Sequence, residues 1–487
     1  MKLLKNSVTI YISMNSIHKI RYIQFFTCFL LISCQSPLAD IYLGMGTKVG
    51  EITDSSAIVY VRLTEIAHQD TFLLVPGKEG QARLSYGLDE NLTGCKTTQW
   101  KDALSKNDYS IQFHLDELLP SQRYYYYVQM REDKKAKINI SDTCSFKTAP
   151  QKSGRYPVKF QVTTGQDLRG IGTYDIMKSQ FPDFLVSTGD NVYYDTGCNA
   201  RTVNEAYQCY QIMYGSKPIV EYFKHIAGYF EKDDHDYRFD DADTIAKGRW
   251  ISVNKIRHGV SKITQVRENQ VYDEAWLTHQ QGIEVFKNVF PMSEKTFRTF
   301  RWGQGIQIWL LEGRDYRSPN NMPDGPDKTI WGKEQKKWLK TTLFNSNADF
   351  RIIISPTPII GPDRQTKIDN HANKKGFWTE GRSFLQWIIE NKLKNVILIC
   401  GDRHWQYHSV YKNFVHEFSC GPTCDEHSVK GKKNQIPPDA SEFKYVEQSY
   451  INLCGGFLTV SYNLDQTIDF TFFSETGDKL YFYQFEE

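Results

Sequence analysis

The chain has 487 residues, of which 40% are hydrophobic, and its 59 Lys and Arg residues nearly balance its 57 Asp and Glu residues. This composition excludes an intrinsically disordered protein. The length exceeds what one compact core usually fills, so we expect two domains. The near-neutral charge gives no reason to expect a nucleic acid partner.

The amino-terminal segment has the order of a secretory signal. A basic stretch at 19–21 precedes an apolar run at 25–32, which is too short to span a membrane, and Leu31-Ile-Ser-Cys34 resembles a bacterial lipobox. We therefore predict that residues 1–34 form a signal peptide with a lipobox. Cys34 would then carry a lipid anchor that holds an exported protein at the membrane of the cell envelope. The alternative is an ordinary signal peptide cut near Ala39.

Eight cysteines follow the signal segment, and an even number in an exported chain permits disulfides. The pairs that we predict first are Cys95 with Cys144 and Cys198 with Cys209, because each pair lies within one structural neighbourhood. Cys420 with Cys424 is a further option. These two residues also have the character of half a zinc site, although the sequence offers no matching second pair.

Residues 38–148 have the pattern of an all-β sandwich. Short apolar strands, such as 56–62 and 124–128, alternate with turn-rich segments. The stretch Leu119 to Val128, with four consecutive tyrosines, resembles the turn and tyrosine-rich strand of fibronectin type III-like domains. The alternative is an exposed aromatic face for carbohydrate. We favour the sandwich because alternate tyrosines of one strand must face opposite sides.

A polar connector at 149–155 is the predicted domain boundary, and a larger α/β domain is predicted over 156–487. In it we expect strands at 158–163, 184–187, 306–311, 350–354 and 396–399, helices near 174–180 and at 333–343 and 384–391, and closing strands at 457–462, 467–473 and 479–485.

Three strand-like runs in this domain each end on a cluster of metal-type ligands. The runs and their clusters are 182–189 with Asp190 and Tyr193, 225–230 with 233–236, and 395–401 with 402–405. In layered α/β proteins ligands collect outside the carboxyl ends of strands, so we expect the three clusters to meet. Hard oxygen ligands with an imidazole and a phenol suit a metal-assisted hydrolase.

The clusters suggest a role for each ligand. Asp190 is the candidate to bridge two cations, and Tyr193 would bring a phenol to one of them, which favours ferric iron. Asp234 and Asp402 add hard oxygens suited to a divalent ion such as Ca²⁺, and His404 adds a nitrogen.

The remaining polar residues near these ligands suit acid catalysis and anion binding. His235, beside Asp234, is placed to donate a proton to a leaving alcohol. Arg314 and Arg403 are candidates to clamp the oxygens of a phosphoryl group. Taken one at a time these residues also fit turns, core positions or surface ion pairs. The order and strand context of all three clusters favour the joint interpretation.

These motifs resemble those of the PhoD-like alkaline phosphatases, the alkaline phosphatase D family within the calcineurin-like metallophosphatases. The matching segments are Gly189 to Tyr193, Asp233 to Asp236, Leu311 to Arg317 and Gly401 to Trp405. The resemblance extends to the preceding sandwich. It implies an α/β fold with a metallophosphatase-type layered β-sheet sandwich flanked by helices, preceded by a fibronectin type III-like all-β sandwich.

The resemblance also implies a site. Asp190 would bridge Fe³⁺ and Ca²⁺, Tyr193 would bind the iron, Asp402 and His404 would complete the ligands, and His235 would act in catalysis. Where the family usually has Ser-Cys-Gln after its first strand, with the cysteine a ligand, this chain has Thr164 to Asp167. Gly165 has no side chain to coordinate, so the iron site would lack a thiolate, use Asp167, or hold another metal.

A second departure lies in the fourth motif, where Glu312-Gly313 replaces the family's usual Asp-Thr ahead of Arg314. The leading hypothesis is an exported, lipid-anchored, metal-dependent phosphohydrolase that cleaves phosphate esters. One alternative is a phosphodiesterase acting on wall, lipid or nucleotide-derived diesters. Others are another metal hydrolase, for instance on sulfate esters, or a glycan-binding module with a structural metal. His235 and Arg403 argue against the last, because a structural site would not require them.

Overall fold

The computed structural model describes residues 40–248, 250–257, 260–267, 276–364, 366–432 and 443–486. The predicted signal segment and Cys34 lie outside these residues. Within them, the helices are all too short or too polar to cross a membrane.

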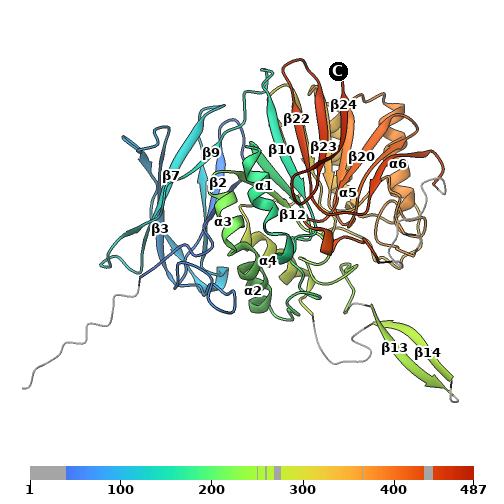
Figure 1. Ribbon diagram of the computed structural model, residues 1–487, viewed down its shortest axis with the longest axis horizontal. Coiled ribbons are helices and arrows are strands. Elements are labelled where there is room, and N and C mark those ends of the chain that lie inside the picture. The colour runs from blue at the N-terminus through green and yellow to red at the C-terminus, as the bar shows by residue number, and fades with distance from the viewer. Residues whose placement is uncertain are drawn as a thin grey trace, which may run out of the picture. The chain divides into compact units, whose positions relative to one another are not determined.

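Residues 40–150 form the predicted all-β sandwich (Figure 1). Its strands are β1 (Thr47–Gly50), β2 (Ala57–Arg62), β3 (Gly80–Gly87), β4 (Lys96–Thr97), β5 (Lys101–Ala103), β6 (Ser110–Leu115), β7 (Arg123–Arg131), β8 (Asn139–Ile140) and β9 (Cys144–Lys147). One sheet has the order β1-β2-β6 and the other β4-β3-β7-β8, with β5 on β3 and β9 on β7. Along β7, Tyr124 and Tyr126 are buried while Tyr125 and Tyr127 are half-buried, so the tyrosines alternate between two faces as predicted.

Two further sheets form the centre of the larger domain. The first has the order β12-β11-β10-β22-β23-β24 and the second β15-β16-β17-β18-β20-β19-β21. The strands of the first are β10 (Val158–Thr163), β11 (Phe184–Thr188), β12 (Ala227–Glu231), β22 (Phe457–Tyr462), β23 (Ile468–Phe473) and β24 (Lys479–Phe485). Those of the second are β15 (Arg298–Trp302), β16 (Ile306–Leu310), β17 (Phe350–Ser355), β18 (Val396–Cys400), β19 (Gln406–Tyr411), β20 (Val415–Cys420) and β21 (Val446–Asn452).

Each sheet contains a block of parallel strands. β10 pairs in parallel with β11, and β11 with β12. In the second sheet the parallel strands are β16, β17, β18 and β20. The carboxyl ends of parallel neighbours lie at the same edge of a sheet, which is where ligands collect in layered α/β folds.

Side-chain alternation along these strands explains the layers. Phe184 and Val186 of β11 enter the same core as Ile397 and Ile399 of β18, which lies between the sheets. Leu185 faces the other way, into a core shared with the helices on that side. Every position of β11 and β18 is therefore buried, and these two strands carry the apolar runs typical of covered sheets.

Helices cover the outer faces of the two sheets (Figure 1). α1 (Thr173–Ser179), α2 (Val203–Tyr214), α3 (Lys217–Phe223) and α4 (His279–Val289) belong to the side of the first sheet, and α5 (Gly332–Phe344) and α6 (Trp378–Glu390) to the side of the second. Among the described residues, β13 (Trp250–Arg257) and β14 (Val260–Arg267) form a separate two-stranded sheet. The predicted fold class is confirmed, and the predicted strands of the larger domain match within one residue or two.

One predicted disulfide is confirmed and the other is wrong. Cys198 is bonded to Cys209, which links the loop after Tyr193 to α2. Cys144 and Cys95 are free thiols. Cys144 lies opposite Tyr126, and β7 and β3 separate it from the strand that follows Cys95. Three strand spacings amount to roughly 14 Å, too far for a disulfide. Cys420 and Cys424 are also free and buried.

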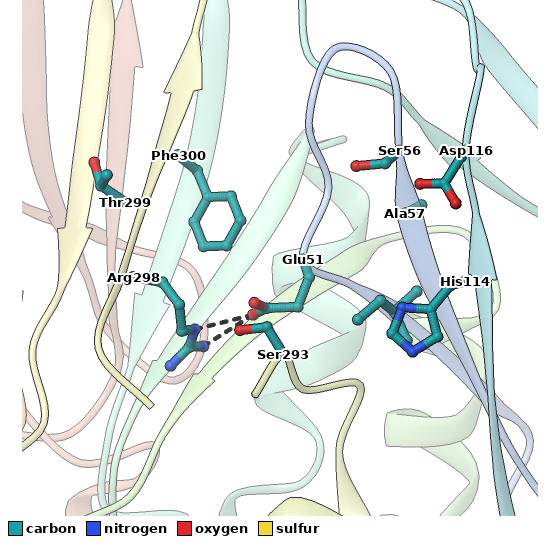
Figure 2. A pocket seen from close by; sticks show the side chains of 10 residues that line it. Glu51, Ser56, Ala57, His114, Asp116, Ser293, Arg298, Thr299 and Phe300 are labelled. Carbon is teal, nitrogen blue, oxygen red and sulfur yellow. Dashed lines mark hydrogen bonds and ion pairs between the residues drawn. The ribbon is translucent and has the colours of Figure 1, made fainter. Parts of the chain in front are cut away.

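The sandwich contacts the larger domain beside a hollow of about 370 Å³ (Figure 2). Arg298 of β15 pairs with Glu51 at 3.0 Å and donates to the carbonyl of Phe230 at 2.9 Å. His114 and Asp116 line the same hollow. None of its lining residues is a predicted site residue, so this hollow is separate from the predicted centre.

Candidate metal centre

The structure brings the three predicted clusters together at the carboxyl ends of both central sheets. Asp190 follows β11, the segment 233–236 follows β12, and the segment 402–404 follows β18 of the other sheet. His404 Nε2 lies 3.6 Å from Asp190 Oδ2. Oxygen atoms of Asp233, Asp234 and Asp402 lie within 4.8 Å of one another.

Tight backbone turns aim these ligands. Asp190 and Asp402 have φ angles of 52° and 61°, a left-handed conformation that non-glycine residues adopt at a cost. Gly401 lies close against the end of β11 in the other sheet, because a Cβ there would be 2.2 Å from the carbonyl oxygen of Thr188. A strained turn therefore follows both β11 and β18 at the site.

The phenol oxygen of Tyr193 is the centre of one group of donors. It donates to Asp190 Oδ2 at 3.0 Å and lies 3.2 Å from His404 Nε2. It also shares a hydrogen bond of 2.8 Å with Nε2 of His427. Burial, together with the neighbouring His427, holds the pKa of His404 well below its ordinary value, so its imidazole is neutral and able to bind a cation.

Carboxylates form the second group. Asp190, Asp234 and His235 offer one cluster of ligand atoms, and Asp233, Asp234 and Asp402 offer another. Asp190 Oδ1 and Asp233 Oδ2 are buried and have no hydrogen-bond partner. Buried carboxylate oxygens are normally satisfied, and a bound cation satisfies them. The residues present therefore fit metal binding, with Asp190 belonging to both groups.

Electrostatics support the same conclusion. Burial raises the pKa of Asp190 to about 6, although His235 opposes this shift. Burial likewise raises the pKa of Asp402 to about 6, against the effect of Arg403. Asp234 behaves differently: burial would raise its pKa, but His235 and Arg314 hold it below the ordinary value. A cation among these groups would stabilise the ionised carboxylates.

His235 is oriented by a residue that the sequence analysis did not single out. Its Nδ1 shares a hydrogen bond of 2.6 Å with Oδ1 of Asp195, whose side chain is buried. Its ring lies 4.5 Å from the ring of Tyr193. Asp195 follows Asp190 by five residues, and this position in the same turn is the signal that points to it.

Arg314 and Arg403 are completely buried and paired with carboxylates. Arg314 Nε donates to Asp233 Oδ1 at 2.7 Å. Arg403 forms ion pairs with Asp363 and Asp402. In this arrangement both guanidinium groups position acidic residues of the site. The predicted contact of either arginine with a phosphoryl group stays a prediction.

The two departures from the family motifs have structural counterparts. Glu312 accepts a hydrogen bond of 2.6 Å from Lys232, so the replaced motif residue forms a buried ion pair beside the site. Asp167 does not reach Tyr193 directly. Its carboxylate accepts hydrogen bonds from Arg169 and lies 3.0 Å from Nδ1 of His427.

His427 is a second residue of the site that the sequence motifs did not indicate. It closes a 3-10 turn, η4 (Asp425–His427), seven residues after the end of β20. β20 is parallel to β18, so its carboxyl end reaches the same edge. Residues 415–420 alternate between apolar and polar side chains only in part, so little in the sequence indicated a strand ending near this histidine.

Two solved structures share this fold. Over 90% of this chain and 92% of the other, the fold matches a structure of PhoD with a TM-score of 0.71 at 16% identity. It also matches the purple acid phosphatase PPD1 from yellow lupin (Lupinus luteus) seeds, with a TM-score of 0.57 at 12% identity, over 90% of this chain and 73% of that one. These identities establish the fold alone, which is that of a metallophosphatase.

Family models identify the chain more closely. Residues 261–456 match the model of PhoD-like phosphatases, and residues 32–150 match that of the PhoD-like phosphatase N-terminal domain. The chain belongs to the PhoD-like phosphatase family and is a phosphoric ester hydrolase. No curated protein matches the sequence at a significant level. The first family segment includes Arg314, Asp402 and His404, whereas Asp190 and His235 precede it.

Proposed function

We propose that this protein is an exported, metal-dependent phosphohydrolase that cleaves phosphate esters at the Asp190 centre. The observation that carries the proposal is the position of Asp190. One of its oxygens contacts the donors around Tyr193, and the other is buried without a partner beside the acidic cluster. A carboxylate so placed suits two cations held close together.

Two cations would be held by different donors. Tyr193, His404 and Asp190 suit a hard, acidic ion, and the resemblance to PhoD-like enzymes suggests Fe³⁺. Asp234 and Asp402 offer the oxygens that Ca²⁺ prefers. Bound there, the cations would supply Lewis-acid polarisation of a phosphoryl oxygen and an activated water.

The chain's own residues would supply the remaining chemistry. His235, held through Nδ1 by Asp195, keeps Nε2 for a proton that passes to the leaving alcohol. Arg314 and Arg403 fix the positions of the Asp233 and Asp402 carboxylates through their buried ion pairs. A phosphate ester enters with its leaving group on the side of His235.

The location is part of the proposal. The disulfide between Cys198 and Cys209 supports export, because such bonds persist in oxidising compartments. The lipobox-like sequence supports attachment at Cys34. Two lipid chains hold a protein firmly at a membrane, whereas one does not.

The experiment combines metal analysis of the purified protein with hydrolysis of a small panel of phosphomonoesters and phosphodiesters. We expect bound metal, and hydrolysis that chelation abolishes. Asp190→Ala should lose metal from more than one position and lower activity by several orders of magnitude. Asp349→Ala is the control, because Asp349 is also a buried carboxylate but pairs with Arg155 at the amino end of β17. Full metal content and activity in Asp190→Ala would refute the proposal.

A further inference from the structure

We propose that His427 is a metal ligand in this protein and takes the place left vacant by the absence of a side chain at Gly165. The inference rests on the proposed metal centre and names a donor that neither the family motifs nor the three strand-end clusters include. The ligand set around Tyr193 would then be two imidazoles, a carboxylate and a phenol, with no thiolate.

Donor geometry is the first support. Three donor atoms surround the Tyr193 oxygen: His427 Nε2 at 2.8 Å, Asp190 Oδ2 at 3.0 Å and His404 Nε2 at 3.2 Å. Ligands that bind one cation through bonds of roughly 2.0–2.2 Å lie about 3 Å from their neighbours. The rings of His404 and His427 are 4.4 Å apart, so both imidazoles face the same space.

A second and independent observation is the buried oxygen of Asp190. Oδ1 has no hydrogen-bond partner although the residue is 1% exposed. Burying a carboxylate oxygen without a hydrogen-bond partner lowers the stability of the fold. Asp190 belongs both to the donors around Tyr193 and to the acidic cluster. A cation held by this group would compensate its charge.

The partner of His427 is the one expected for a metal-binding histidine. Its Nδ1 lies 3.0 Å from Asp167 Oδ2, which leaves Nε2 directed at Tyr193. Metal-ligating histidines usually donate their other nitrogen to a carboxylate, which fixes the tautomer and the ring orientation. Arg169 holds Asp167 in turn, through its backbone and its guanidinium. Asp167 is thus a positioning residue in this proposal.

The loop that carries His427 also explains why residue 165 is glycine. Pro422 forms a bridge with Thr164, and Thr423 donates to the carbonyl of Gly165 at 3.4 Å. A Cβ on Gly165 would lie 3.0 Å from Pro422 and 3.3 Å from His404 Nε2, and its φ of +55° disfavours other residues. The loop therefore fills the space that a side chain at residue 165 would occupy. The same loop places the imidazole of His427 near Tyr193.

Zinc binding to the metal-free protein tests this role. Metals are removed with a chelator, and Zn²⁺ affinity is measured by competition with a chelating dye, for the wild type and for His427→Ala, His427→Gln and Asp167→Asn. We expect His427→Ala and His427→Gln to weaken the tighter site by at least about 100-fold, and Asp167→Asn by about 10- to 100-fold. His225→Ala is the control, since His225 is an exposed histidine that bonds Ser145 away from the site.

The outcomes separate this inference from the proposed function. Circular dichroism and thermal unfolding establish that each variant is folded. If the wild type binds zinc and both His427 variants bind it equally well, His427 is not a ligand. If His427→Gln alone keeps the wild-type affinity, His427 acts only through its hydrogen bond to Tyr193, which also overturns the inference. A wild type that binds no metal would refute the proposed function itself.

Discussion

The pair formed by His235 and Asp195 provides a quantitative test of leaving-group protonation. Asp195→Asn removes a carboxylate whose oxygen lies 2.6 Å from Nδ1 of His235. A hydrogen bond to a charged partner contributes about 1.5–3 kcal/mol, which corresponds to about 10- to 150-fold in rate. We expect this loss in kcat/KM for alkyl phosphates. His235→Ala removes the acid itself and should cost about 10²- to 10⁴-fold.

Nitrophenyl phosphates should respond much less to either change, because their leaving group departs without a proton. The assay is therefore the ratio of kcat/KM for an alkyl and a nitrophenyl ester, measured beside the metal content of each variant. Asp349→Asn, a buried carboxylate bonded to Tyr462, should leave the ratio unchanged. Equal slowing of both esters with full metal content would refute the proton-transfer role, and loss of metal would make His235 a ligand.

Three other predictions concern colour, location and acid stability. If Tyr193 binds Fe³⁺, the protein should show a phenolate-to-iron absorption band that Tyr193→Phe abolishes; a colourless, active, zinc-loaded protein would contradict iron binding. Cys34→Ser should move the protein out of the membrane fraction, and unchanged partitioning would exclude the anchor. Burial lowers the pKa of His408 to about 3 and that of His416 to about 4. The contribution of these neutral imidazoles to the free energy of unfolding is fully present above their unfolded pKa of about 6.5. It decreases as pH falls towards 4, by about 1.4 kcal/mol per pH unit for His408. Denaturant unfolding of His408→Phe should show a smaller loss over this range, and an equal loss would exclude the effect.

The central strands could be predicted because burial on both faces leaves an apolar run with sharp ends. Phe184 to Ser187 and Val396 to Ile399 are such runs, and each lies within an observed strand. The same property conceals which sheet a strand joins. β11 and β18 have equivalent patterns, yet they belong to different sheets that face each other across one core.

The predicted site residues came from strand ends, and the residues missed lie further along their loops. Asp190 and Asp402 lie two residues beyond the ends of their strands, whereas Asp195 and His427 each lie seven residues beyond theirs. Only the folded loop brings them back, and a single histidine in a polar segment has no distinctive pattern. The wrong pairing of Cys95 has a similar cause, because nearness in sequence does not reveal how many strands lie between two residues.

The strand order of the first sheet bears on how the protein is synthesised. β10 has β11 on one side and β22 on the other, and β22 comes from the far end of the larger domain. A ribosome therefore completes Asp190, His404 and His427 before β22 exists. Until then one edge of β10 is unpaired, and exposed edges invite pairing with other chains. The nascent protein would be most vulnerable to aggregation in this interval, and a chain truncated before Phe457 would keep every proposed ligand while losing half of the sheet that supports Asp190.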